Sequence, residues 1–250
     1  MTMKQDIHQL STIQRYPIGF KYPKTNPLDL RSYRYGRAGN GLQCSSGAHL
    51  GFTQDVNFCN VTVDLAAAGK RTLEITVANT DGRLGNGNIG ANELAGGYII
   101  IFPDGMGDTI NRMIVANTAT IGGGVMTITV DKPLTVALSP APHAECIASP
   151  YLDVVYGNYG KQMIVGIPTM AAVAGEYLWL QTWGPTWAAP GGVVWNGPEN
   201  TLAMFDGSGN IEAFDEADPV VGAHQIAGDI MTPLPAGVSG APFLFLRITQ

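Results

Sequence analysis

Two short stretches of the sequence have residue types that could bind a ligand. Residues 85–90 (GNGNIG) match the glycine pattern of dinucleotide-binding loops, in which backbone amides at the start of a helix hold a pyrophosphate. Here the pair Gly96-Gly97 follows, which would break a helix, and the chain leads into another apolar strand pattern. We therefore interpret residues 85–90 as a surface loop.

Residues 206–210 (DGSGN) look like the start of a calcium-binding loop. A loop of that kind ends on a bidentate Glu, and Ala217 stands at that position instead. A tight turn between two strands explains the residues more simply. His143 and Cys146 have the spacing of half a zinc site, but no second pair completes the ligand set. We therefore predict no bound metal and no cofactor.

Residues for covalent or acid–base catalysis occur without a recognisable arrangement. The sequence has no G-x-S-x-G nucleophile elbow. We interpret the carboxylates of Glu212, Asp215, Glu216 and Asp218 as a solvated turn and not as a glycosidase pair. The histidines, at unrelated positions, are His8, His49, His143 and His224. The sequence therefore predicts that the protein is not an enzyme.

The composition restricts the possible partners. Charged residues make up 14% of the chain, below the ~25% of an ordinary globular domain, which favours a surface shared with neighbouring proteins. The 14 basic residues are scattered and the net charge is −6, so we expect no direct nucleic-acid binding. No apolar run approaches ~20 residues, so we expect no membrane-spanning helix. The first ten residues lack the apolar stretch of a secretory signal, and Cys44, Cys59 and Cys146 suit free thiols in a reducing cytosol.

The hydrophobic periodicity is that of β-strands. Residues 72–77, 126–130 and 134–138 alternate with period two, and residues 98–102 are apolar on both faces. Further strands are expected at residues 109–116, 152–156, 162–167, 176–183, 201–205 and 242–248. No segment sustains a helical apolar stripe for three turns. The sequence predicts an all-β fold, a sandwich and/or barrel of roughly ten or more short antiparallel strands.

Three regions are expected along the chain. Residues 1–30 are polar, contain prolines and lack a period, which is typical of an extended N-terminal arm. We expect this arm to order on a neighbouring subunit or on another protein. Prolines near residue 145 suggest a boundary between a first β region, residues 31–145, and a second, residues 146–250, although the two could also form one domain.

The strand expected at residues 176–183 is unusually aromatic. Alternation places Tyr177, Trp179, Gln181 and Trp183 on one face and the two leucines of the strand on the other. Such a row belongs to a core or a subunit interface, or it forms a platform on which sugar rings stack. We favour core or interface.

Several segments, in this order, resemble a family of tailed-phage virion structural proteins described as capsid decoration or head-associated proteins. They are residues 31–39 (RSYRYGRAG), 91–98 (ANELAGGY), 126–138, 149–151, 165–168 and 174–185 (AGEYLWLQTWGP). Together they cover roughly residues 31 to 190. Residues 1–30 and 85–90 depart from the pattern.

The resemblance implies a non-catalytic protein on the capsid surface of the virion, made in the host cytoplasm, that decorates or cements the shell. It implies the major capsid protein and further copies of this chain, as a trimer on local threefold axes, as partners. We expect interface contacts at Tyr33, Arg34, Tyr35, Tyr177, Trp179 and Trp183. Two alternatives remain open: a receptor- or glycan-binding fibre domain that stacks sugars on Trp179, Trp183 or Trp187, and a phage-borne hydrolase.

Overall fold

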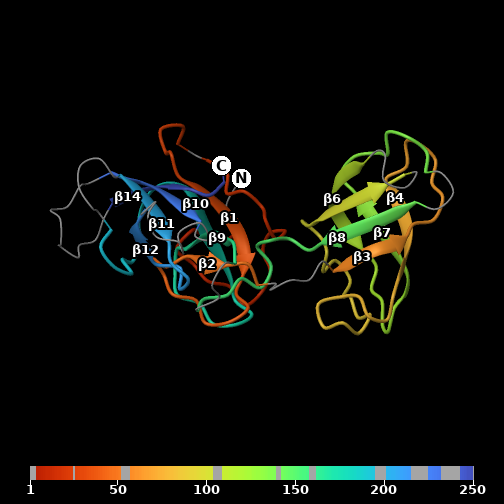
Figure 1. Cartoon of the computed structure of the whole chain (residues 1–250), viewed down its shortest axis with the longest axis horizontal. Helices are drawn as coiled ribbons and strands as arrows, with labels where there is room; N and C mark the ends of the chain where they lie inside the picture. Colours follow the sequence, from red (N-terminus) through yellow and green to blue (C-terminus); the bar gives the residue numbers. More distant parts are fainter. Residues whose placement is uncertain are drawn as a thin grey trace. The chain divides into compact units, whose positions relative to one another are not determined.

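A computed structural model describes residues 4–24, 26–51, 57–103, 109–138, 142–157, 162–194, 201–214, 225–231 and 243–249. This part of the chain is all-β, with fourteen strands that pair antiparallel in two sheets. The prediction of an all-β fold is confirmed. The chain forms two compact units (Figure 1): unit 1 consists of Met1–Gly51 and Pro150–Gln250, and unit 2 of Phe52–Ser149.

Unit 1 contains an eight-stranded sheet. Its strands are β1 (Ser32–Arg37), β2 (Ala48–His49), β9 (Ile164–Pro168), β10 (Tyr177–Trp187), β11 (Leu202–Phe205), β12 (Ile211–Ala213), β13 (Ile226–Ile230) and β14 (Phe243–Arg247). They lie in the order β12, β11, β13, β14, β10, β9 and β2, and β1 also pairs with β10. One face of this sheet buries an apolar cluster that includes Phe205, Ile211, Leu244 and Leu246.

Unit 2 contains a six-stranded sheet that curls until its first and last strands meet. Its strands are β3 (Phe58–Thr62), β4 (Thr72–Val77), β5 (Tyr98–Phe102), β6 (Ile110–Asn117), β7 (Gly124–Val130) and β8 (His143–Ile147), in the order β3, β8, β5, β6, β7 and β4. Val63 forms a bridge with Ile75 of β4, and the Asp64 N–H donates to the Glu74 carbonyl at 2.8 Å. This contact joins the two edge strands, which removes exposed backbone edges there.

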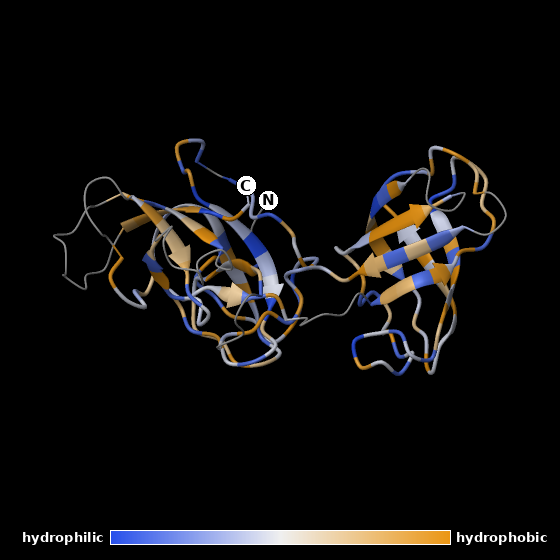
Figure 2. Ribbon diagram, in the orientation of Figure 1, coloured by the Kyte–Doolittle hydropathy of each residue, from blue (hydrophilic) through white to orange (hydrophobic). Residues whose placement is uncertain are grey.

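The alternation predicted for residues 72–77 is present in β4. Leu73, Ile75 and Val77 are buried, and the residues between them are exposed. Figure 2 shows the resulting stripes of hydrophobic and hydrophilic residues along the strands of unit 2. Burial of one strand face against the core is the physical source of this pattern.

The division into units differs from the linear division expected from the sequence. The strand β1 lies in the predicted first region, yet it pairs with β10 from Ser32 opposite Trp183 to Arg37 opposite Tyr177. Unit 2 is therefore an insertion into unit 1, and the predicted first region, residues 31–145, is shared between the two units. The chain leaves and re-enters unit 1 at neighbouring points. Gly51 and Asp153 lie so close together that a Cβ added to Gly51 would be 1.7 Å from the Asp153 carbonyl oxygen. Insertions are tolerated where the two ends of a segment lie close together.

The N-terminal segment packs on the sheet of unit 1 in its own chain, whereas the sequence predicted an extended arm that orders on a neighbouring subunit or on another protein. Ser11 and Tyr177 exchange backbone hydrogen bonds of 3.1 and 2.8 Å, and the Tyr35 N–H donates to the Phe20 carbonyl at 2.9 Å. Tyr16 and Ile18 are buried. Irregular backbone gives no periodic pattern, so the sequence did not reveal that these apolar side chains cover a sheet.

Candidate functional site

Trp179 lies at the centre of an aromatic cluster inside unit 1. Its ring centroid lies 5.4 Å from that of Tyr16, 4.9 Å from Tyr22 and 5.0 Å from Tyr35. Its indole N–H points to the Gln5 carbonyl at 3.4 Å, and the side chain has no exposed surface. We call Tyr16, Tyr22, Tyr35 and Trp179 the aromatic core cluster. Trp179 is thus a core residue of the protomer, as one of the favoured interpretations held.

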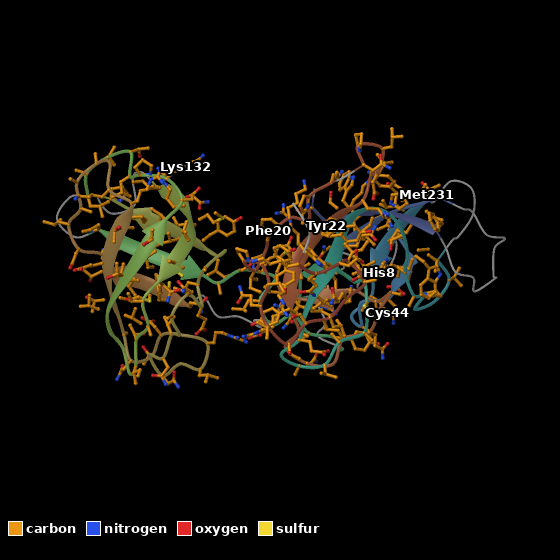
Figure 3. The ribbon with its side chains drawn as sticks, turned by 180° about the vertical axis from the view of Figure 1, so that it is seen from behind. His8, Phe20, Tyr22, Cys44, Lys132 and Met231 are labelled. Atoms are coloured by element: carbon orange, nitrogen blue, oxygen red, sulfur yellow. The ribbon has the colours of Figure 1, made fainter. Side chains whose placement is uncertain are left out.

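The N-terminal segment also covers most of the other residues expected at an interface. Tyr33 and Tyr35 are buried, and burial raises the pKa of the Tyr35 hydroxyl to about 12. Tyr177 is half-buried and stacks on Tyr35 at 5.9 Å between centroids. Arg34 is half-buried and donates from Nη1 to the Gly19 carbonyl at 3.2 Å. Figure 3 labels Phe20 and Tyr22 of the covering segment.

Trp183 has a different environment from the other five. It follows the covered part of β10 and lies where β10 pairs with β14, in register from Trp183 opposite Arg247 to Trp187 opposite Phe243. On β14, Leu244 and Leu246 are fully buried, so Phe243 and Phe245 point to the opposite, outward side. Trp183 and Phe245 meet edge to face with centroids 5.7 Å apart.

Four aromatic side chains therefore project from the outward side of β10 and β14. We call Trp183, Trp187, Phe243 and Phe245 the aromatic face. Trp187 is 40% exposed and Phe243 is 44% exposed. Directly after the end of β13, Met231 is 48% exposed and its N–H donates to the Phe243 carbonyl at 2.7 Å (Figure 3). Met231 thus extends the apolar surface beside Phe243.

An ion pair lies beside the aromatic face. Arg247 Nη2 is 2.6 Å from Asp229 Oδ2, and both side chains are partly exposed. Asp229 stands opposite Phe245 in the pairing of β13 with β14. An exposed pair of this kind contributes at most about 1 kcal/mol to stability. Its position, next to exposed aromatic rings, matches the polar rim that surrounds the apolar centre of protein interfaces.

The aromatic face can bind a partner by burying apolar surface. Trp, Tyr, Phe, Met and Arg are enriched in interfaces, and single exposed hydrophobic residues are common whereas contiguous ones mark binding sites. Exposed aromatic rings also stack on the apolar faces of sugars. The sequence placed Trp183 and Trp187 among candidate contacts, but it did not identify Phe243 and Phe245, because only the pairing of β10 with β14 brings them together.

The glycine-rich residues 85–90 form a loop that is fixed by a second loop of unit 2. The Gly87 carbonyl accepts from Gly123 N–H at 3.0 Å and from the Thr120 hydroxyl at 2.9 Å, and Asn88 Oδ1 accepts from Gly122 N–H at 2.8 Å. Turns, and not a helix, follow at residues 91–96. The interpretation of a loop is confirmed, and the helix N-terminus that a dinucleotide site needs is missing at this place.

Residues 206–210 form the predicted tight turn. Asp206 Oδ1 accepts from the N–H groups of Ser208 at 2.8 Å and Asn210 at 2.9 Å. Within the described residues, no three His, Cys, Asp or Glu side chains are close enough together to hold a metal ion. The carboxylates Asp215, Glu216 and Asp218, Ala217 and His224 lie outside the described residues.

The three cysteines are free thiols, as predicted. Cys59 Sγ lies 3.4 Å from Glu145 Oε1, and this carboxylate raises the pKa of the thiol. Burial raises the pKa of Cys146. Both effects favour the protonated, less reactive thiol. The described part of the chain contains no helix long and apolar enough to cross a membrane.

The chain matches no family model, no curated protein and no solved structure.

Proposed function

We propose that this protein is a non-catalytic structural component of a phage virion that decorates or cements the capsid shell. The observation that carries the proposal is the aromatic face, Trp183, Trp187, Phe243 and Phe245, which projects from a rigid sheet. The proposal also rests on the resemblance of residues 31–190 to capsid decoration proteins. The most aromatic of the resembling segments, residues 174–185, contains most of β10.

A rigid aromatic face suits a contact that must be repeated over a shell. Aromatic side chains have few rotatable bonds, so ordering them in an interface costs little conformational entropy. The strands that carry these rings are fixed by the buried side of the same sheet, where Leu244 and Leu246 pack. The low fraction of charged residues, 14%, also favours a surface shared with neighbours.

The proposed partners are the major capsid protein and further copies of this chain. A trimer on a local threefold axis is the proposed assembly, because the resemblance to capsid decoration proteins implies this position. The proposed location is the outer surface of the capsid.

Imaging of assembled particles tests this function. Many copies of the protein spread over the shell at symmetry-related positions would support decoration. A few copies at a single vertex or on the tail would contradict it and indicate a fibre or tail component.

Glycan binding is the second candidate function, and the exposure of Trp187 favours it. Trp183 and Trp187 lie four residues apart on one strand, so their outward side chains are separated by about 13 Å along it. A sugar-binding screen with the purified protein separates the two candidates. Binding that is lost in Trp187→Ala, together with unchanged attachment to capsids, would favour the glycan-binding function.

A further inference from the structure

The N-terminal segment forms a polar cleft on unit 1, distinct from the aromatic face. The cleft has a volume of about 290 Å³, and residues between Lys4 and Arg15 line it together with Glu176. Its polar lining includes Gln5, Gln9 and Ser11. Ligand pockets have volumes of roughly 300–1,000 Å³, so this cleft lies at the lower limit of that range and suits only a small ligand, such as a monosaccharide.

The two cationic residues of the cleft are held in place by buried tyrosines. The Lys4 N–H donates to the Tyr16 hydroxyl at 2.5 Å, and the Arg15 N–H donates to the Tyr35 hydroxyl at 3.1 Å. Tyr16 and Tyr35 both belong to the aromatic core cluster, whose rings pack on Trp179. The backbone on which each positive side chain stands is therefore fixed before any ligand arrives.

Gln5, which also lines the cleft, is held in place by hydrogen bonds. The Gln5 side chain is almost fully buried and donates from Nε2 to the carbonyls of Gln9 at 2.7 Å and Tyr177 at 3.0 Å. Its Oε1 accepts from the Tyr35 hydroxyl at 2.7 Å. A ligand would lose little affinity to reorganisation of such a site.

The charge of the cleft is positive although the chain as a whole carries −6. Among the described residues, the Lys4 ammonium and the Arg15 guanidinium form no hydrogen bond or ion pair. Glu176 supplies one negative charge, but its Oε2 accepts from the Val173 N–H at 2.9 Å. The residues that line the cleft thus carry two positive charges and one negative charge, and a backbone amide already engages the single carboxylate.

We propose that this cleft binds a small polar molecule that carries an oxyanion, such as an acidic sugar or a sugar phosphate. The guanidinium fork of Arg15 matches the two oxygens of a carboxylate or phosphate, and Lys4 adds a second positive charge. The side-chain amide of Gln9 and the hydroxyl of Thr12, which also line the cleft, can serve the ligand's hydroxyl groups.

Calorimetric titration of the full chain tests the proposal with four probes: glucuronate, glucose 6-phosphate, inorganic phosphate and uncharged glucose. We expect binding of the anionic sugars, weaker or no binding of glucose, and loss of affinity as salt is raised. Glucuronate and glucose 6-phosphate distinguish a carboxylate from a phosphate as the recognised group. Binding of inorganic phosphate as tight as that of glucose 6-phosphate would show that the sugar contributes nothing and would overturn the size argument.

Two charge-removing variants complete the test. Lys4→Gln and Arg15→Gln should each weaken binding of the anionic sugars about tenfold or more, because charge-assisted hydrogen bonds are the stronger class. Lys24→Gln is the matched control, since Lys24 is exposed and does not line the cleft. Unchanged melting temperatures show that the variants are folded. Equal binding of glucose and glucuronate, no binding of any anionic sugar at millimolar concentration, or equal loss in Lys24→Gln would overturn the proposal.

Discussion

The Arg37 guanidinium pairs with the Asp153 carboxylate at the point where the chain returns from unit 2 to unit 1. Asp153 adopts a positive φ of 54°, and its carbonyl oxygen faces Gly39 and Gly51. The Asp153 side chain is 12% exposed, and the pair raises the pKa of Arg37. One ion pair thus connects β1 to the returning chain, so the insertion point of unit 2 is fixed by side chains as well as by backbone.

Removal of this ion pair should destabilise unit 1. We expect Arg37→Ala to lower the free energy of unfolding by about 2–4 kcal/mol, somewhat less than for a fully buried pair, because it leaves the mostly buried Asp153 carboxylate without its cation. Arg31→Ala is the control, since Arg31 pairs with Asp29 at the surface and should cost less than about 1 kcal/mol. Urea denaturation measures both. Equal effects of the two substitutions would contradict the structural role of Arg37.

Trp179 and Trp187 of β10 differ in burial, and their substitution should therefore differ in its effect on stability. We expect Trp179→Ala to cost about 3–5 kcal/mol, because it leaves a cavity at the centre of the aromatic core cluster. Trp187→Ala should change stability by no more than about 0.5 kcal/mol, because Trp187 is exposed. Thermal melts with each variant check this. A large loss for Trp187→Ala would mean that its ring is a part of the core.

Stability should fall in mild acid because of His49. Burial lowers the pKa of His49 in the folded protein, although the nearby Asp206 and a hydrogen bond with the Gln162 backbone act in the opposite direction. The folded pKa lies below the ordinary value of about 6.5, so the unfolded chain binds the proton more readily. The contribution of neutral His49 to the free energy of unfolding is therefore fully present above about pH 6.5 and decreases as the pH falls toward the folded pKa.

Chemical denaturation across this pH range measures the effect. The slope of unfolding free energy against pH below about 6.5 should be smaller in His49→Gln than in the unmodified chain. His8→Gln is the control, because His8 is exposed. If the slope is the same in all three proteins, His49 does not account for the acid sensitivity.

Unit 2 should fold without unit 1. Its six strands pair among themselves, and β3 and β4 meet to complete the sheet. Residues 52–149 expressed alone should therefore give a cooperative melt, with a dispersed NMR spectrum that overlays signals of the full chain. Deletion of residues 4–22 from the full chain should lower the melting temperature of unit 1, because it removes Tyr16 and Tyr22 from the aromatic core cluster and uncovers Tyr35 and Trp179, and should leave that of unit 2 unchanged. An unfolded unit 2 fragment would show that the insertion depends on its host.

Sequence patterns predicted the strands better than they predicted what covers them. Alternation placed Trp179 and Trp183 on one face of β10, but the pairing of β10 with β1 shifts register between Trp183, opposite Ser32, and Gln181, opposite Tyr33, so strict alternation does not run through this part of the strand. Trp179 is fully buried under Tyr16 and Tyr22 of the N-terminal segment, whereas Trp183 lies beyond the register shift, where β10 pairs with β14, and is half-buried. The period of a strand tells which side chains share a face, but not which distant segment lies over them.

The long-range pairings were also beyond the sequence patterns. The pairing of β1 with β10 joins residues more than a hundred positions apart, and it makes unit 2 an insertion. The aromatic face depends on the pairing of β10 with β14, and no local pattern links Trp187 to Phe243. Local signals such as the Asp206 turn were predicted correctly, because their hydrogen bonds stay within a few residues.

Attachment to capsids through the aromatic face is measured by the amount of protein that remains on the particles when this face is altered. Particles assembled with the double variant Trp187→Ala, Phe243→Ala should carry at least tenfold less of this protein than particles with the unmodified chain, because exposed aromatic anchors dominate such interfaces (about 1.4 kcal/mol for each factor of ten). The control Leu84→Ala, which changes a residue of unit 2 that is 81% exposed, should attach normally. Normal attachment of the double variant, with its melting temperature unchanged, would contradict the proposal that the aromatic face is the contact with the capsid.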